Sequence, residues 1–343
     1  MPKPNQNSNK SPSEDSVRLF ARDYPVLDRI RIRGRLYLIL ERVSVAHRER
    51  FLGYDPARGP RGGAVCVTML PRSEASTQQH LKVLQRNSES NSSLPDILDF
   101  DAQGDRVIVV SRWVRGVTLS RFLHDIREGR QHRISSILAF QRIQGLAHGV
   151  CRWHQRGQWC HGDIKPENIV VSTDPGRFIL IDFGSAWVNA MSAFRQAGDG
   201  VSPFYAAPEQ LTPGGRVDFR ADQFSLTGVL YQLLTLQLPF EGLGGRAGVN
   251  PQSKVAIPKL VPPSELAADR EKIPRAIWKG IDRVVSRGLR FDPDARYSTP
   301  QAWLDDLEEV ALDIKRPPIG TESNRMVTGV LDWLTGRRSS DDT

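Results

Sequence analysis

The chain has 343 residues, of which 25% are charged and 39% hydrophobic; this is the balance of a soluble globular protein, and no apolar run approaches the roughly 20 residues that would cross a membrane. Three cysteines without paired spacing, and a polar N-terminus without a signal-peptide core, favour a cytoplasmic protein with reduced thiols. The net charge of +8 is spread along the chain without a dense basic block, so we expect a solvated basic surface and no nucleic-acid partner.

The first part of the chain divides into an arm and a strand-rich region. Residues 1–23 are rich in Asn, Ser, Pro and Lys and are expected to form a disordered arm. Residues 24–115 contain short apolar runs with strand-like composition and one short segment with helical periodicity. The expected strands are 36–40, 50–54, 64–70 and 107–110, and the expected helix is 76–86.

Residues 116–315 have a helical pattern, and a tail of residues 316–343 follows. Apolar stripes at helical spacing predict the long helices. The Gly- and Pro-rich stretch 242–263 is expected to be a surface loop. In the tail, residues 326–334 form a short amphipathic piece that is expected to dock on its own domain; a partner or a membrane surface is the alternative. The expected helices are 135–156, 221–234, 277–289 and 300–312.

The most informative stretch is His161-Gly162-Asp163-Ile164-Lys165-Pro166-Glu167-Asn168, which is followed by Asp182-Phe183-Gly184. Two short β-branched runs, 169–171 and 178–181, lie between these motifs and are bounded by turn residues. They predict a hairpin. Asn168 and Asp182 then lie at its two open ends, close enough to share a metal ion.

These residue types suit phosphoryl transfer from a magnesium nucleotide, in which the protein mainly positions groups and neutralises charge. Asp163 can accept a proton from an attacking hydroxyl, and Lys165 can lie against the transferred phosphoryl group. Asn168 and Asp182 offer the hard oxygen ligands that Mg²⁺ prefers. The predicted catalytic residues are therefore Asp163, Lys165 and Asn168, and the predicted metal ligands are Asn168 and Asp182.

This segment resembles the catalytic loop and metal-binding turn of eukaryotic-type serine/threonine protein kinases. Further matching stretches follow in the family's order: Ala207-Pro208-Glu209, Ala221-Asp222-Gln223-Phe224 and Asp292-Pro293-Asp294-Ala295-Arg296. The resemblance implies an α+β bilobal kinase fold, with a small β-rich N-lobe and a larger helical C-lobe. It also implies ATP and Mg²⁺ as cofactors and a protein substrate. Two structural contacts are implied as well: Asp222 braces the catalytic loop, and Glu209 pairs with Arg296.

The resemblance also places an adenine site between the lobes. Residues 111–115 match the hinge, whose backbone groups bind the edge of adenine, so that Ser111 is the gatekeeper and Trp113 lies in the hinge. Cys66 and Val170 match the residues on the two sides of adenine. The alternative for both is an ordinary role in the apolar core.

The small lobe departs from the family in three places. The loop 43–49 has no glycine, so its backbone amides approach phosphate less easily. Thr68 stands where the family has a lysine on the third strand, and His80 stands where a helix supplies the partner glutamate. Arg48 falls at the position from which with-no-lysine kinases take their cation. The alternative is that Arg48 and Arg50 face solvent.

Three functions follow from these matches and departures. The preferred hypothesis is a serine/threonine protein kinase. The second is a pseudokinase that acts as a nucleotide-binding scaffold or sensor. The third is a small-molecule phosphotransferase, because aminoglycoside and choline phosphotransferases share a His-Gly-Asp loop, and Gly162 replaces the arginine of protein kinases. Ser202 falls where the family has a threonine whose hydroxyl binds the catalytic aspartate.

Overall fold

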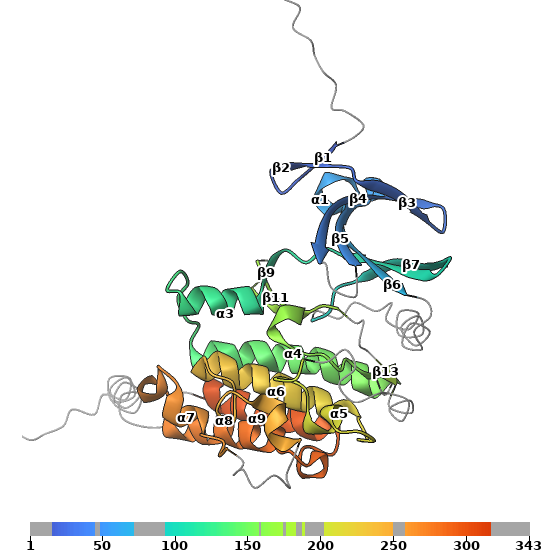
Figure 1. Cartoon of the computed structure of the whole chain (residues 1–343). Coiled ribbons are helices and arrows are strands. Elements are labelled where there is room, and N and C mark those ends of the chain that lie inside the picture. Colours follow the sequence, from blue (N-terminus) through green and yellow to red (C-terminus); the bar gives the residue numbers. More distant parts are fainter. Residues whose placement is uncertain are drawn as a thin grey trace, which may run out of the picture.

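The computed structural model describes residues 16–44, 49–71, 93–157, 159–173, 176–182, 187–188, 202–249 and 258–316. A small lobe built on a β-sheet lies above a larger helical lobe (Figure 1). Arg48, the expected helix 76–86 with His80, and the tail from residue 317 lie outside the described residues.

The small lobe is built on a six-stranded antiparallel sheet with the order β3-β4-β5-β6-β8-β7. One face of this sheet forms a core that includes Tyr37, Val65 and Val67. The four expected strands are confirmed, and two further strands, β3 and β7, extend the sheet at its edges. The strands are β3 (Asp28–Ile32), β4 (Arg35–Ser44), β5 (Glu49–Tyr54), β6 (Ala64–Pro71), β7 (Ile97–Gln103) and β8 (Arg106–Arg112). A 3₁₀ turn, η1 (Pro56–Arg58), and a short helix, α1 (Gly59–Gly62), join β5 to β6.

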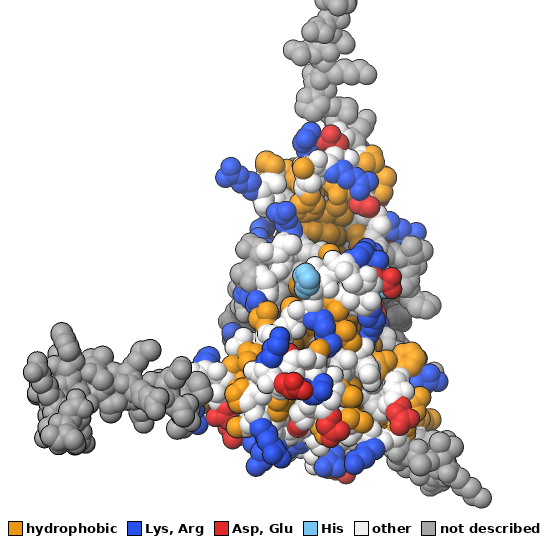
Figure 2. Space-filling model, turned by 90° about the vertical axis from the view of Figure 1, so that its left-hand side faces the viewer, with side chains coloured by type: hydrophobic (Ala, Val, Ile, Leu, Met, Phe, Trp, Pro, Cys, Tyr) orange, Lys and Arg blue, Asp and Glu red, His pale blue; other side chains and the backbone are white. Residues whose placement is uncertain are grey.

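An N-terminal hairpin lies where part of the disordered arm was expected. It consists of β1 (Ser16–Leu19) and β2 (Arg22–Pro25). The arm boundary at residue 23 is therefore wrong: Leu19 and Tyr24 pack against Leu40 and Leu52 of the sheet, and this burial orders a segment of mainly polar composition. Seen from the side on which β9 and α3 lie, hydrophobic side chains gather below the charged residues at the top of the molecule (Figure 2).

The large lobe is organised around α6 (Phe219–Thr235), whose residues from Ala221 to Thr235 are all buried. A helix that is buried on every side is typical of the centre of a helical domain. It packs against α4 (Ser136–Gly157) and α8 (Arg275–Gly288), and α9 (Pro300–Lys315) packs on both of these. The other helical elements within the described residues are α3 (Leu119–Arg127), α5 (Pro208–Leu211), α7 (Pro263–Leu266), η2 (Pro166–Asn168), η5 (Gly244–Gly248), η6 (Arg270–Lys272) and η7 (Pro293–Ala295).

The predicted hairpin lies at the top of the large lobe. Its strands are β11 (Ile169–Ser172) and β12 (Phe178–Leu180), and β9 (Gly116–Thr118) pairs with the other edge of β11. Gly116, where the chain enters this lobe, has a φ of 150°, and a Cβ atom there would lie 2.1 Å from the carbonyl oxygen of Val171. The close approach of β9 to β11 therefore requires glycine at this position. A second small sheet pairs β10 (Trp159–Cys160) with β13 (Trp187–Val188).

The stretch 242–263 differs from the expected surface loop. Gly244 and Gly245 are buried, and a Cβ atom on either would collide with the backbone carbonyl of Phe204 or Ala206. This part of the stretch therefore supports the segment that leads into α5, and its glycines allow the close contact. Among the described helices, none combines the length and the apolar character needed to cross a membrane.

Candidate active site

The catalytic loop is held from below by Asp222, in the first turn of α6. Its carboxylate accepts hydrogen bonds from the backbone N–H groups of His161 (2.7 Å) and Gly162 (2.9 Å) and is bonded to His154 Nε2 (2.9 Å). Burial alone would raise the pKa of Asp222, but these hydrogen bonds and the nearby histidines lower it below its ordinary value. The predicted brace is confirmed, and α6 thereby fixes the path of the loop.

His161 connects the catalytic loop to the residue that precedes Asp182. Its Nδ1 accepts a hydrogen bond from the Asp163 backbone N–H, and its Nε2 is bonded to the carbonyl oxygen of Ile181, both at 3.3 Å. This pair of contacts requires a neutral imidazole with its proton on Nε2. Burial lowers the pKa of His161 and favours the same neutral form. The buried, uncharged His161 thus holds the segment with Asp163 next to the segment with Asp182.

Asp163 is bound by three donors and is only 8% exposed. Its Oδ2 contacts Lys165 Nζ at 2.7 Å and Asn168 Nδ2 at 3.1 Å. Its Oδ1 accepts a hydrogen bond of 3.2 Å from the backbone N–H of Ser202. The sequence predicted that the Ser202 hydroxyl binds Asp163. The bond in the structure comes instead from the backbone N–H of Ser202, which any residue except proline would supply. The carboxylate is therefore oriented before any substrate binds.

Asn168 and Asp182 come together at the open end of the hairpin, because the Ile181 N–H donates to the Asn168 carbonyl oxygen (2.7 Å). The side-chain nitrogen of Asn168 donates to Asp163, so its side-chain oxygen lies on the opposite edge of the amide. Asp182 has a φ of 66°, a left-handed conformation that is uncommon outside glycine and often marks functional sites.

This donor set fits a magnesium nucleotide better than a resident metal ion. Among the described residues, no group of three His, Cys, Asp or Glu side chains is arranged to hold a metal. An amide oxygen and one carboxylate are too few to enclose an ion by themselves. Mg²⁺ is commonly held by one or two protein ligands together with water and substrate phosphates. Asn168 and Asp182 match that pattern.

Gln210 of α5 ties the catalytic loop to the segment before α5, and sequence analysis did not identify it. Its Nε2 donates to the carbonyl oxygen of Gly162, and its Oε1 accepts from the Ala207 N–H, both at 2.9 Å. The available signal was a glutamine at the third position of a short helix, where such side chains bond back to the preceding backbone. Its partner in the catalytic loop is 48 residues away in the chain and gives no local signal.

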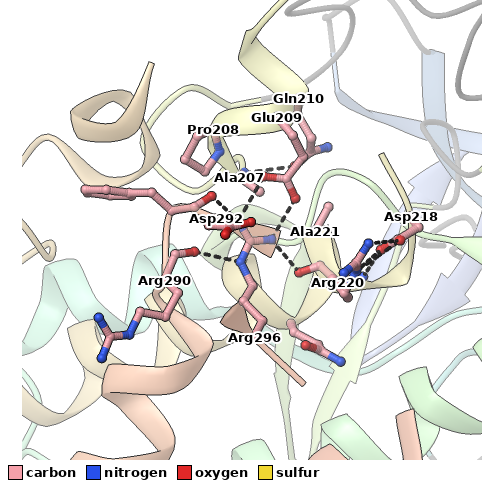
Figure 3. A network of polar contacts seen from close by, with 12 residues as sticks. Ala207, Pro208, Glu209, Gln210, Asp218, Arg220, Ala221, Arg290, Asp292 and Arg296 are labelled. Carbon is pink, nitrogen blue, oxygen red and sulfur yellow. Dashed lines mark hydrogen bonds and ion pairs between the residues drawn. The ribbon is translucent and has the colours of Figure 1, made fainter. Parts of the chain in front are cut away.

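The predicted pair of Glu209 and Arg296 is confirmed and is buried. The guanidinium binds the carboxylate with two parallel contacts, Nη1 to Oε1 at 2.6 Å and Nη2 to Oε2 at 2.8 Å (Figure 3). The side chain of Arg296 is fully buried and that of Glu209 is 8% exposed. The guanidinium also donates to the backbone carbonyls of Arg220, Arg290 and Phe291. This pair fastens α5 to the segment before α9.

The small-lobe residues predicted to surround adenine lie on neighbouring strands. Cys66 of β6 is opposite Ser111 of β8, and Val170 is buried in β11 of the other lobe. Burial raises the pKa of Cys66, so its thiol stays neutral. The Trp113 side chain packs on the cluster that contains Leu19 of the N-terminal hairpin.

Arg50 of β5, in the small lobe, contacts Asp182 of the large lobe. Its Nη2 lies 3.4 Å from Asp182 Oδ2, and the two side chains are 20% and 10% exposed. The interpretation that Arg50 faces solvent is therefore wrong. Residue alternation along a strand shows which side chains share a face, but it does not show which face another lobe covers.

Comparison with known proteins agrees with this geometry. The family model for the protein kinase domain matches residues 65–306. The serine/threonine-protein kinase PknE of Mycobacterium bovis is 29% identical over 72% of this chain and 41% of its own length. The serine/threonine-protein kinase PrkC of Bacillus subtilis is 26% identical over 74% of this chain and 37% of its own length. The chain thus spans less than half the length of these curated relatives.

The fold is also shared with a solved structure. The crystal structure of the Mycobacterium tuberculosis PknI kinase domain superimposes with a TM-score of 0.57 at 20% sequence identity, covering 82% of this chain and 98% of that one. At this level of identity the likeness concerns the fold, and it agrees with the expected α+β bilobal architecture. With the matched domain and the braced catalytic loop taken together, the chain belongs to the protein kinase family.

Proposed function

We propose that the protein is a serine/threonine protein kinase that transfers the γ-phosphate of ATP to a hydroxyl group of a protein substrate. The observation that carries this proposal is the assembly of Asp163, Lys165 and Asn168 with Asp182 in one site. Buried contacts from α6 and α5 hold these groups in place without a ligand. A protein that served only as a scaffold would have no chemical need for all four.

Each residue has a role that its contacts support. Bound ATP and Mg²⁺ supply the phosphoryl group and neutralise part of its charge. Asn168 and Asp182 would hold the metal through their side-chain oxygens. Asp163 is oriented by the Ser202 amide and would accept the proton of the substrate hydroxyl. Lys165, at 2.7 Å from Asp163, carries a positive charge beside the position of transfer.

The names of the relatives support a protein substrate, since PknE and PrkC are both called serine/threonine-protein kinases. The three cysteines are free thiols, and Cys151 and Cys160 are buried, which supports a reducing, cytoplasmic location. The roles of Cys66, Ser111, Trp113 and Val170 in binding adenine are part of the same proposal. The proposal also includes the absence of a nucleic-acid partner and the docking of the tail on a partner.

The test is incorporation of labelled phosphate from ATP into a library of seryl and threonyl peptides, with magnesium present. We expect Asp163→Asn to lower the rate by about 10²–10⁴, the usual contribution of a positioned general base. Asp125→Asn is a suitable control, because this partly buried aspartate of α3 pairs with the surface arginines Arg121 and Arg130.

Each alternative function gives a different result in this experiment. Incorporation that is equal in Asp163→Asn and the unaltered protein would contradict the proposal. Binding of ATP without any incorporation would support the pseudokinase hypothesis. Phosphorylation of aminoglycosides or choline in place of peptides would support the small-molecule phosphotransferase.

A further inference from the structure

Strand β6 of the small-lobe sheet has no lysine at the position where the family resemblance led us to expect one. Thr68 of β6 occupies that position, and it lies directly opposite Arg50 of β5 in the antiparallel register. Side chains of directly opposed residues lie on the same face of a sheet. The side chains of Arg50 and Thr68 therefore lie on the same face of the sheet, on the adjacent strands β5 and β6.

The other face of these two strands is closed by the core of the small lobe. Phe51, Val65 and Val67, which alternate with Arg50 and Thr68, all pack into that core. The face with Arg50 must then be the one turned toward the large lobe. The ion pair of 3.4 Å between Arg50 and Asp182 shows that the guanidinium reaches the predicted metal ligand.

The guanidinium of Arg50 has unused binding capacity in this position. Its Nε is buried and has no hydrogen-bond partner in the part of the chain that the structure describes. Its contact with Asp182 is longer than a good charge-assisted hydrogen bond, which measures about 2.7–2.9 Å. A planar guanidinium with free donors matches the oxygens of a phosphate group.

Arg50 also lies beside the predicted adenine wall. Leu52 and Cys66 are the next opposed pair of the same two strands, on the same face. Arg50 contacts Asp182, and the charges of both act on the pKa of the Cys66 thiol, so the three side chains lie near one another. A nucleotide whose base contacts Cys66 would extend its phosphates toward Arg50 and Asp182.

We propose that Arg50 is the small-lobe cation that binds the phosphates of the nucleotide, in place of a lysine at residue 68. In the ligand-free protein Arg50 neutralises Asp182. When Asp182 takes up the metal, the guanidinium exchanges this carboxylate for phosphate oxygens. This inference rests on the proposed function to the extent that ATP must bind in the cleft. It assigns the cation to Arg50 of the strand, not to Arg48 of the preceding loop.

The test compares ATP with adenosine, which lacks phosphates, by calorimetric titration in the presence of magnesium. Arg50→Ala is expected to weaken ATP binding at least about tenfold and to change adenosine binding less than about twofold. Adding Thr68→Lys to Arg50→Ala returns a cation to the opposite strand and is expected to restore most of the lost affinity for ATP. Arg106→Ala is the matched control, since this β8 arginine is half-exposed and binds Glu49 on the surface.

Several results would overturn the inference. Unchanged or tighter ATP binding in Arg50→Ala would show that the arginine does not hold phosphate. Equally weakened binding of ATP and adenosine in Arg50→Ala would show that the substitution alters the shape of the binding site and does not remove a phosphate contact. A selective loss in Arg48→Ala alone would assign the role to the loop. If the unaltered protein bound neither ATP nor adenosine, the proposed function itself would be contradicted.

Discussion

The two lobes use buried polar groups in different ways. In the large lobe, these groups converge on the catalytic loop: Asp222 holds its backbone from below, and Gln210 holds Gly162 from the side. In the small lobe, the buried carboxylate of Asp55 pairs with Arg35 and caps the turn after β5. The small lobe therefore orders its own loops, whereas the large lobe orders the site.

This difference suggests how the active site can persist with an altered small lobe. Among the described residues, contacts within the large lobe position Asp163 and Asn168, and the ion pair of Arg50 and Asp182 adds a contact from the small lobe. The strands and loop of the small lobe are then free to vary, provided that they still cover the base and supply one cation. Changes in the large lobe should accordingly cost more than comparable changes in the small lobe.

The largest expected effect on stability comes from Arg296→Ala. The change leaves the carboxylate of Glu209 buried without its partner, and breaking a buried pair from one side costs about 3–5 kcal/mol. Chemical denaturation would measure this loss in the free energy of unfolding. Replacing both partners together, as Glu209→Gln with Arg296→Met, should recover part of it. A loss below about 1 kcal/mol in the single variant would show that the pair does not fasten α5.

A smaller loss is expected for Gln210→Ala. The change removes the partners of the Gly162 carbonyl and the Ala207 N–H, both in buried surroundings, at a cost of about 1–3 kcal/mol. The rate of phosphate transfer should fall as well, because the catalytic loop loses its lateral contact. Gln301→Ala is the control, since Gln301 is exposed and bonds Asp305 on the same helix. Equal behaviour of the two variants would argue against a role for Gln210.

His161 gives the large lobe a defined dependence on pH. Burial lowers its pKa in the folded state, so the unfolded chain takes up a proton first as the pH falls through about 6.5. Stability is therefore complete above this pH and declines below it, by up to about 1.4 kcal/mol for each pH unit.

The measurement is the free energy of unfolding at several values between pH 7.5 and 5.5. His161→Gln should flatten the profile in this range. His148→Gln, which alters a histidine whose side chain is 40% exposed beside Glu308, should leave it unchanged. A profile with the same slope in His161→Gln would show that another group causes the acid sensitivity.

The smallest effect is expected in the small lobe, at Glu49. This residue joins Arg42 and Arg106 on the sheet surface, at 2.7 Å and 2.8 Å, and all three side chains are at least one-third exposed. Surface pairs contribute about 0–1 kcal/mol and are screened by salt. Glu49→Gln should thus lower stability by less than about 1 kcal/mol, and the difference should vanish in 1 M NaCl. A larger loss that resists salt would mean that the small lobe is held together by charge.

The parts of the fold that sequence analysis predicted are those with a local signal. The hairpin of β11 and β12 followed from two β-branched runs, and with it the proximity of Asn168 and Asp182. The N-terminal hairpin was missed because its polar strands become ordered only through Leu19 and Tyr24, which pack on a distant part of the sheet.

In the site, too, residues within a sequence motif were predicted and residues that bond distant parts of the chain were missed. Charged residues in a known order identified Asp163 and its neighbours. His154 and Gln210 were missed because they bond groups more than 40 residues away in the chain. The orientation of Arg50 depends on the register of β5 against β6 and on the covering lobe, and neither can be read from alternation along one strand.

The central claim is that the cleft holds a metal-bound nucleotide mainly through the large lobe. It is tested most directly by calorimetric titration of ATP, with and without magnesium, into the unaltered protein and Asp182→Asn. We predict that magnesium tightens ATP binding to the unaltered protein and has little effect on the variant, while adenosine binds both equally. If ATP affinity were the same with and without magnesium in the unaltered protein, the claim would be contradicted.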